Sequence, residues 1–464
     1  MPNSLSRREF LRDMGLIGAG VGAAAAVPLG AVEAFGEDWS DKVTMVDRPW
    51  WVKEVDKPTT EINWEGMQRF NERNTARRGF PKYVGEDEVK RLSALQADNV
   101  KRFVAENKPG YSLRDMALYN ADSLVPGTTF LPPAEGILTP EDRGVSRWEG
   151  TPEENSTMIR AALRSFGAAT VGFVELYPET TEKLIYSIDP DGKELVFTDD
   201  EQASETETSR FIPRKARWVI VWTVQMSQET LTRAPTPLGA MTTAMAYDRN
   251  NFITHRLQSF LKGIGYLGLG EQGINALGIA PAFGVMAGLG ELGRINRLIT
   301  PEYGPMVRVF KMVTDLPLAP TKPIDAGILN FCKACKTCAE YCPSGALSFD
   351  TEPTWDIRGD WNNPGHKAWF ENAIACRSYW YEVGTNCGIC FSVCPFSQKD
   401  KAFIHQMVQA TIATTPMLNG FFTDMSRMSY LSRPAGEPQK DTEEWWNLDL
   451  PEMGFETSRG HSDV

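Results

Sequence analysis

The sequence predicts an α+β chain with a separate cysteine-rich unit near its C-terminal end, and three observations support this prediction. At 464 residues the chain exceeds the size that one hydrophobic core usually organises, so two or three structural units are expected. Short apolar runs alternate with long helical patterns between about 150 and 325, which is typical of an α/β core. All 8 cysteines lie between positions 332 and 394.

The amino terminus has the pattern of an export signal. Arg7 and Arg8 stand before an apolar run over 14–32, and the small residues that follow would allow cleavage near Ala34. Paired arginines are typical of the twin-arginine route. The alternative is a membrane anchor, because the run nearly reaches the roughly 20 residues that span a bilayer. Its many glycines and alanines, with Pro28 inside, favour a signal peptide over residues 1–34.

Residues 35–150 are predicted to be an N-terminal region that packs on the core, with a charged helix over 87–107. The core itself, residues 151–325, begins at Thr151 and Pro152, a cap residue and a first-turn proline that predict a helix start. Four short apolar runs then predict strands, and a long amphipathic pattern predicts a helix. The strands are expected at 170–177, 183–188, 194–198 and 218–226, and the helix at 238–264.

Two patterns in the core suggest functions that we do not expect. Gly268, Gly270 and Gly273 match G-x-G-x-x-G, but this motif follows a helix, whereas the dinucleotide fingerprint follows a strand. A helix terminus and loop is the better interpretation. The four histidines, at 255, 366, 405 and 461, share no metal-ligand spacing and are expected to be surface or packing residues.

The cysteines are spaced as ligands of two iron–sulfur cubanes. The first run is C-x2-C-x2-C-x3-C-P, the two-cluster ferredoxin spacing in which the fourth cysteine binds the other cluster. We therefore predict a ferredoxin-like domain over 326–400 with two [4Fe–4S] clusters. One set of ligands is Cys332, Cys335, Cys338 and Cys394, and the other is Cys342, Cys376, Cys387 and Cys390. Ten residues separate Cys376 from Cys387, a length that a loop can absorb at little entropic cost.

Zinc and disulfides are the alternative uses of these cysteines. Two four-cysteine zinc sites need only paired C-x2-C motifs, not a triplet followed by C-x3-C-P. Disulfides would be scattered along a chain of this length.

The segment after the cluster domain, 401–464, is expected to hold helices near 399–412 and 417–430, with its tail along the surface. The net charge of −12 argues against a nucleic-acid partner.

The arrangement resembles the respiratory reductive dehalogenases, corrinoid and iron–sulfur enzymes, over essentially the whole chain. The resemblance rests on the export signal, the cysteine runs, the block TDLPLAPTKPIDAG at 314–327 and the block RPWWVK at 48–53. It implies a nitroreductase-like core that holds a base-off corrinoid next to the cluster bound by Cys342, Cys376, Cys387 and Cys390. The D-x-H-x-x-G corrinoid motif is absent, which agrees with the family pattern.

The same resemblance implies catalytic roles for Tyr247 as proton donor, for Arg308 as its partner and for Asn275, although the sequence around Asn275 departs from the family pattern. A phenol titrates near pH 10 and is protonated at neutrality. A nearby guanidinium favours the phenolate that remains after proton transfer. Without the resemblance, Tyr247 would be interpreted as an aromatic residue at a helix cap and Arg308 as a surface arginine.

The predicted function is removal of halide from an organohalide, with chlorinated ethenes as the expected substrates. The resemblance also implies a small integral-membrane anchor subunit, an electron donor from a respiratory chain, and a place on the outer face of the cytoplasmic membrane. Two alternatives remain open at this stage. An epoxyqueuosine-reductase-like enzyme would act on tRNA and would need a basic face. An exported electron carrier with two clusters would not need an α/β portion of this size.

Overall fold

The structure, a computed structural model, describes residues 48–49, 51–120, 127–133, 136–397, 403–431 and 433–451. The described residues from Arg48 onward belong to one compact unit. The predicted signal peptide lies outside the described residues, as does its cleavage site. The domain boundaries at 150, 325 and 400 stay predictions. No helix in the described part of the chain is both long and apolar enough to cross a bilayer.

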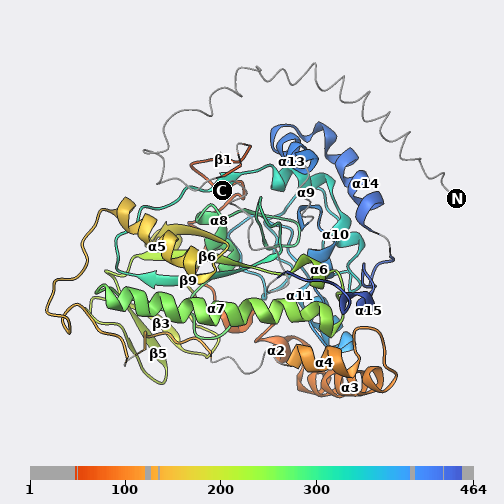
Figure 1. The fold of residues 1–464 in the computed structure, drawn as a ribbon, viewed down its shortest axis with the longest axis horizontal. Coiled ribbons are helices and arrows are strands. Elements are labelled where there is room, and N and C mark those ends of the chain that lie inside the picture. The colour runs from red at the N-terminus through yellow and green to blue at the C-terminus, as the bar shows by residue number, and fades with distance from the viewer. Residues whose placement is uncertain are drawn as a thin grey trace. The chain divides into compact units, whose positions relative to one another are not determined.

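The helices and strands follow one another from the N-terminal region to the C-terminal segment (Figure 1). The α-helices are α2 (Phe80–Val84), α3 (Glu86–Ala105), α4 (Leu113–Asn120), α5 (Pro152–Phe166), α6 (Gln228–Leu231), α7 (Pro237–Gly263), α8 (Ala280–Met286), α9 (Ile328–Ala334), α10 (Thr337–Glu340), α11 (Ala373–Val383), α12 (Ile389–Ser392), α13 (Phe403–Thr414), α14 (Asn419–Tyr430) and α15 (Thr442–Trp445). The strands are β1 (Lys53–Glu54), β2 (Thr170–Glu175), β3 (Glu194–Thr198), β4 (Ser204–Glu205), β5 (Ser209–Pro213), β6 (Trp218–Gln225), β7 (Glu291–Leu292), β8 (Leu298–Ile299), β9 (Val307–Thr314) and β10 (Ile324–Asp325).

The centre of the fold is a three-stranded antiparallel sheet in the order β2-β6-β9. Alternate residues of β6 enter two separate cores. Ile220, Trp222 and Val224 pack with the core on the side of α5 and α7, while Val219 and Val221 pack with the core that contains residues of α8. This period of two is the pattern of a strand buried on both faces. The central strand therefore separates two helical layers.

The ends of α5 and α7 follow from their sequences. Thr151 and Glu154 form a reciprocal capping box at the start of α5, and Gly167 ends the helix with φ 104°. Thr236 accepts a hydrogen bond from the Gly239 amide at the start of α7, next to a proline in the first turn. Figure 1 shows α7 as the long green helix that lies beside β9, and it packs against both β9 and β6.

Most of the predicted elements are present, but three expectations were wrong. Residues 183–188 do not form a strand, because Thr181–Leu184 is a 3₁₀ helix and only isolated bridges follow it. The Thr181 hydroxyl accepts from the Tyr177 amide and donates to the Glu175 carbonyl, which closes a turn where the strand was expected. The spacer between Cys376 and Cys387 is largely helix α11, not a loop.

The third wrong expectation concerns the C-terminal tail, which is partly buried. Trp445 is 8% exposed, and its indole donates to the Thr230 hydroxyl of α6 at 3.1 Å. The indole of Trp446 donates to the Asp115 carboxylate of α4 at 2.8 Å. Buried indole N–H groups need such acceptors, and here the core elements supply them.

Candidate active site

The site lies in a cavity of about 930 Å³ between the central sheet, α7 and the cysteine-rich segment. Its walls include Tyr247, Arg308 and Asn275, the three residues expected to be catalytic, and also Cys342, Cys376, Cys387 and Cys390. A smaller hollow is lined by Cys332, Cys335, Cys338 and Cys394. Residues from distant parts of the sequence therefore converge on two neighbouring spaces. The roles assigned to them from the sequence stay predictions.

Tyr247 and Arg308 come from two elements that face each other. Thr243 and Tyr247 are four residues apart on α7, so their side chains share one face of the helix. Arg308 lies in β9 two residues before Phe310, and alternation places both on the face toward α7. The Phe310 ring meets the Tyr247 ring edge-on, with centroids 5.6 Å apart.

The Arg308 guanidinium is held beside the phenol ring. Its Nη2 donates to the Thr243 hydroxyl at 3.0 Å, and its Cζ lies 5.9 Å from the centroid of the Tyr247 ring. Burial lowers the pKa of Arg308, and Tyr247 is the strongest of the neighbours that oppose this effect. The Nε of Arg308 is buried and has no hydrogen-bond partner within the described residues. One donor of this cation therefore remains available to a ligand.

Three further arginines that the sequence analysis did not single out, Arg77, Arg297 and Arg377, line the same cavity. Desolvation lowers the pKa of Arg77, which precedes α2, and Tyr247 is the strongest opposing influence. Arg377 of α11 stacks near Trp380, with its Cζ 5.1 Å from that ring. Nothing in their local sequence distinguishes these arginines from solvated charges. Only the fold brings them to the site.

Asn275 reaches the cavity from the loop that contains the G-x-G-x-x-G match. As expected, this segment is not a strand-to-helix turn, because it follows α7 and Leu269 bridges to Val313 of β9. Asn275 has φ 64°, a left-handed conformation that asparagine tolerates better than most residues. This backbone conformation helps to set the position of Asn275 at the cavity wall.

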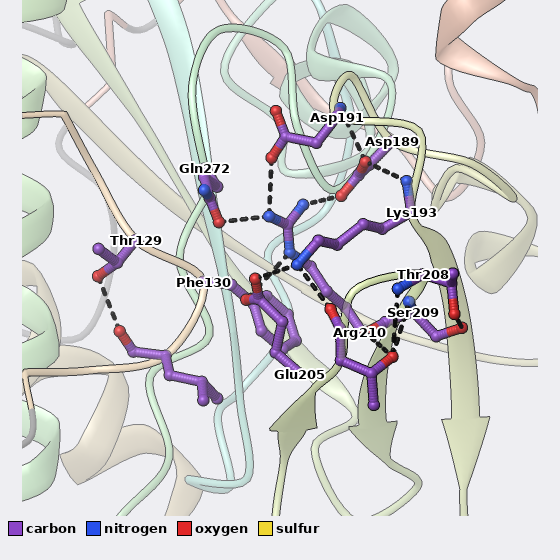
Figure 2. Close-up of polar contacts among 12 residues, drawn as sticks. Thr129, Phe130, Asp189, Asp191, Lys193, Glu205, Thr208, Ser209, Arg210 and Gln272 are labelled. Atoms are coloured by element: carbon purple, nitrogen blue, oxygen red, sulfur yellow. Dashed lines mark hydrogen bonds and ion pairs between the residues drawn. The ribbon is translucent and has the colours of Figure 1, made fainter.

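A buried arginine anchors the same loop to the β3-β5-β4 sheet. Figure 2 shows the Arg210 guanidinium pointing between Asp189, Asp191 and Gln272, with Glu205 at its Nε. Its Nη2 donates to the Asp191 carboxylate at 2.8 Å and also to the Gln272 side chain. Its Nη1 pairs with Asp189, and both of these side chains are 1% exposed. Because Gln272 is three residues before Asn275, the network supports one wall of the cavity.

The eight cysteines are all free, and four of them line the smaller hollow while the other four line the large cavity. Their assignment as two sets of cluster ligands stays a prediction. Cys332 is in α9, Cys338 is in α10, and Cys394 follows α12. Within the described residues, no three His, Cys, Asp or Glu side chains converge as the ligands of a single metal ion would. The first set of four thiols instead lines the smaller hollow, and the second set lines part of the large cavity.

The chemistry of the thiols fits a positively charged inorganic centre. Burial raises the pKa of Cys332 and of Cys387 to about 12, so neither thiol ionises at neutral pH without a bound cation. Metal coordination supplies positive charge and deprotonates a thiol outright. The hollows and their buried thiols therefore match the demands of iron clusters.

One histidine, His366, lines the cavity, and its contacts agree with the expectation of a packing residue. Burial lowers the pKa of His366 to about 4, so its imidazole is neutral at pH 7. The ring meets the Phe370 ring edge-on at 5.1 Å, which is a packing contact. The side chains of His405 and His461 lie outside the described residues.

Comparison with known proteins agrees with this geometry. Residues 47–131 and 192–318 match the family described as reductive dehalogenase subunit, and residues 331–397 match the 4Fe-4S double cluster binding domain. The chain is 28% identical to a trichloroethene reductive dehalogenase from Dehalococcoides mccartyi strain 195, over 97% of this chain and 98% of the relative. It is 34% identical to a tetrachloroethene reductive dehalogenase from Sulfurospirillum multivorans, over 59% of this chain and 56% of that protein.

The fold is also that of a solved member of this group. A catabolic reductive dehalogenase superposes with a TM-score of 0.61 at 21% identity, over 86% of this chain. The superposition covers 50% of that protein, so this chain spans about half of its length. The similarity confirms the predicted fold class, and the double-cluster match confirms two [4Fe–4S] clusters. By its fold, its cysteine-rich unit and its full-length relatives, the chain belongs to the reductive dehalogenase family.

Proposed function

We propose that this enzyme removes halide from chlorinated ethenes with electrons that pass through its two iron–sulfur clusters, and that Tyr247 donates the proton. One observation carries the proposal. A single cavity is lined by Tyr247, four arginines and the four thiols of the second cysteine set. The names of the relatives, which act on trichloroethene and tetrachloroethene, support this substrate class.

The cavity also fits a corrinoid, which we propose as the resident cofactor. Its volume of about 930 Å³ is near the upper end of the range of ligand pockets. Its wall carries buried polar atoms that have no partner within the described residues, and such atoms need a ligand or water. They are Thr60 Oγ1, Arg308 Nε, Asn363 Oδ1, Arg377 Nε and Trp380 Nε1.

The overall reaction requires two electrons and one proton for each halide released. An organohalide takes up two electrons and a proton, the carbon–halogen bond breaks, a carbon–hydrogen bond forms, and halide leaves. A reduced corrinoid in this cavity, supplied with electrons by the clusters, would provide the electron pair. The chain's own residues then have to place the substrate, exclude water and deliver the proton.

We propose that Tyr247 delivers that proton. The Cζ of Arg308 lies 5.9 Å from the centroid of the Tyr247 ring, and Arg77 acts on Tyr247 from the segment before α2. Both guanidinium groups stabilise the phenolate that remains after proton transfer. A placed acid contributes roughly 10²–10⁴-fold to a rate. Asn275 is proposed to orient the substrate from the loop side.

The proposed partners follow from the respiratory role. We propose export by the twin-arginine route, attachment to the outer face of the cytoplasmic membrane through a small anchor subunit, and reduction by a respiratory donor. The calculated net charge of −12 supports a partner that is not a nucleic acid.

The test is an activity panel on the full chain reconstituted with iron, sulfide and a corrinoid. Haloalkenes, haloalkanes and haloaromatics are compared under a strong reductant, with halide release as the measurement. We expect the highest kcat/KM for chlorinated ethenes. Release of halide from haloaromatics alone would overturn the substrate class. A purified chain with iron–sulfur absorption but no affinity for a corrinoid would leave only an electron carrier.

A further inference from the structure

A buried arginine lies between the central fold and the first cysteine run. Arg294, between β7 and β8, is 1% exposed. Its guanidinium donates to the carbonyl of Cys332 at 2.7 Å and to that of Cys335 at 3.1 Å. It also donates to the carbonyls of Ser348 at 2.8 Å and Asp350 at 2.7 Å. Arg294 thus ties two backbone segments together around the smaller hollow, which it also lines.

Among the described residues no carboxylate forms an ion pair with Arg294, although the buried Glu291 acts on the same thiol, Cys332, as Arg294 does. All its hydrogen bonds there go to neutral backbone carbonyls, and the Trp369 ring lies 4.6 Å from its Cζ. A buried charge without a counter-ion is costly. The anionic group that would compensate it is a thiolate-ligated cluster in the adjoining hollow.

The second cysteine set has a different electrostatic environment. Arg297, three residues further on, pairs with Glu371 at 2.6 Å, and both lie at the wall of the large cavity. The positive charge of Arg297 near Cys376 and Cys390 is therefore largely offset by a carboxylate. Arg308 also acts on Cys390, so the second set has two nearby arginines, one of which is paired with a carboxylate.

We propose that Arg294 is a positioning residue that raises the reduction potential of the cluster held by Cys332, Cys335, Cys338 and Cys394. This inference rests on the cluster assignment of the proposed function. Reduction adds one electron, and hence one negative charge, to the cluster. A nearby buried cation stabilises that added charge more than water would, because the local dielectric is low. Charge and hydrogen bonding around a cluster are known determinants of its potential.

The test compares Arg294→Gln with the unmodified full chain, both carrying two clusters. Midpoint potentials are measured by titration with titanium(III) citrate, followed by electron paramagnetic resonance at low temperature. We expect the signal of the first cluster to require a more negative potential, while that of the second keeps its value. Arg217→Gln removes an exposed arginine, 45% exposed at its side chain, and serves as the matched control that shifts neither.

Two results would overturn the proposal. One is an unchanged first-cluster potential in Arg294→Gln with both clusters present, and the other is an equal shift of both clusters. If Arg294→Gln does not assemble the first cluster, Arg294→Lys decides. If Arg294→Lys assembles the first cluster, the site requires the positive charge, which supports the proposal. If neither variant assembles it, Arg294 only holds the backbone segments together and the proposal is wrong. These potentials are measured without an organohalide, so a failure of the proposed dehalogenation leaves the test intact.

Discussion

At the scale of single residues, the proposed chemistry depends on the positions of charges rather than on an unusual tyrosine. Tyr247 lies on α7 one turn after Thr243, and the Thr243 hydroxyl fixes the Arg308 guanidinium. Arg77 adds a second positive charge from a segment 170 positions earlier in the sequence. A phenol that gives up its proton between two guanidinium groups forms a phenolate that does not need water to stabilise it.

The first prediction concerns Tyr247→Phe, which removes the hydroxyl and keeps the ring against Phe310. We expect turnover to fall by about 10²–10⁴-fold, the usual contribution of a placed proton donor. Binding of the corrinoid and its reduction should be unchanged, because neither step uses the hydroxyl. Steady-state halide release and the ultraviolet–visible spectrum of the reduced protein measure the two effects separately.

Tyr177→Phe is the matched control, since Tyr177 is 48% exposed and is not among the cavity-lining residues. It should retain full turnover. If Tyr247→Phe also retained full turnover, the proton would have to come from another group, and the proposed role of Tyr247 would be wrong.

The identity of the site residues could be predicted only in part from the sequence. Tyr247 and Arg308 are predicted from the family resemblance alone, because a lone tyrosine in a helix and a lone arginine in a strand carry no local signal. Arg77 and Arg377 were missed for the same reason. The cysteines were found by spacing alone, since C-x2-C-x2-C-x3-C-P is set by the geometry of the cluster.

At the scale of elements, β9 contributes residues both to the candidate site and to the core on the opposite face of the sheet. Arg308 faces α7, while Lys311, three residues later, faces the opposite core and pairs with Glu271. The side chains of Lys311 and Glu271 are 0% and 4% exposed. Burial raises the pKa of Glu271, and Lys311 is the main opposing influence. This pair connects β9 to the loop that leads to Asn275.

The second prediction concerns Lys311→Met, which leaves Glu271 buried without its partner. Breaking such a pair costs about 3–5 kcal/mol of folding free energy. The loss should be full at high pH and should shrink as the pH falls through the folded pKa of Glu271. Below that pKa the folded chain binds a proton at Glu271, and no unpaired charge remains. Thermal denaturation at several pH values measures this dependence.

The double variant Lys311→Met with Glu271→Gln should recover much of the lost stability at neutral pH, because it removes both charges. Lys322→Met is the matched control, as Lys322 pairs with Asp56 at the surface at 2.9 Å. Surface pairs contribute little. A loss of stability in Lys311→Met that does not vary with pH would show that packing, not the unpaired carboxylate, is responsible.

Helices and strands were predicted correctly where a local sequence pattern defines them. The prediction failed where contacts with distant parts of the chain determine the secondary structure. The capping box at Thr151 and the long apolar face of α7 defined their helices correctly. The run 183–188 looked like a strand, but polar contacts of Thr181 turned the chain there. The strand β9 was not predicted, although it pairs along the whole of β6.

At the scale of the whole molecule, the two cysteine runs are interleaved rather than separate. Cys394 follows the second run yet lies with the first three cysteines, and Cys342 ends the first run yet faces the large cavity. Helices α13 and α14 pack against α9 beside this crossing. The crossing was predictable from the spacing. The proximity of the second set to Tyr247 was not, because it depends on how α11 and α12 meet the core.

The last prediction tests the crossing with two single substitutions in the reconstituted chain. Cys394→Ser should weaken or abolish the first cluster, and Cys342→Ser the second, because each removes one thiolate of four. The two are separated by electron paramagnetic resonance of the reduced protein with the corrinoid bound as cob(II)alamin. Only the second cluster faces the cavity, so only its signal should broaden through coupling to the corrinoid. That broadened signal should survive in Cys394→Ser and disappear in Cys342→Ser, and the opposite result would show that each run binds its own cluster without crossing.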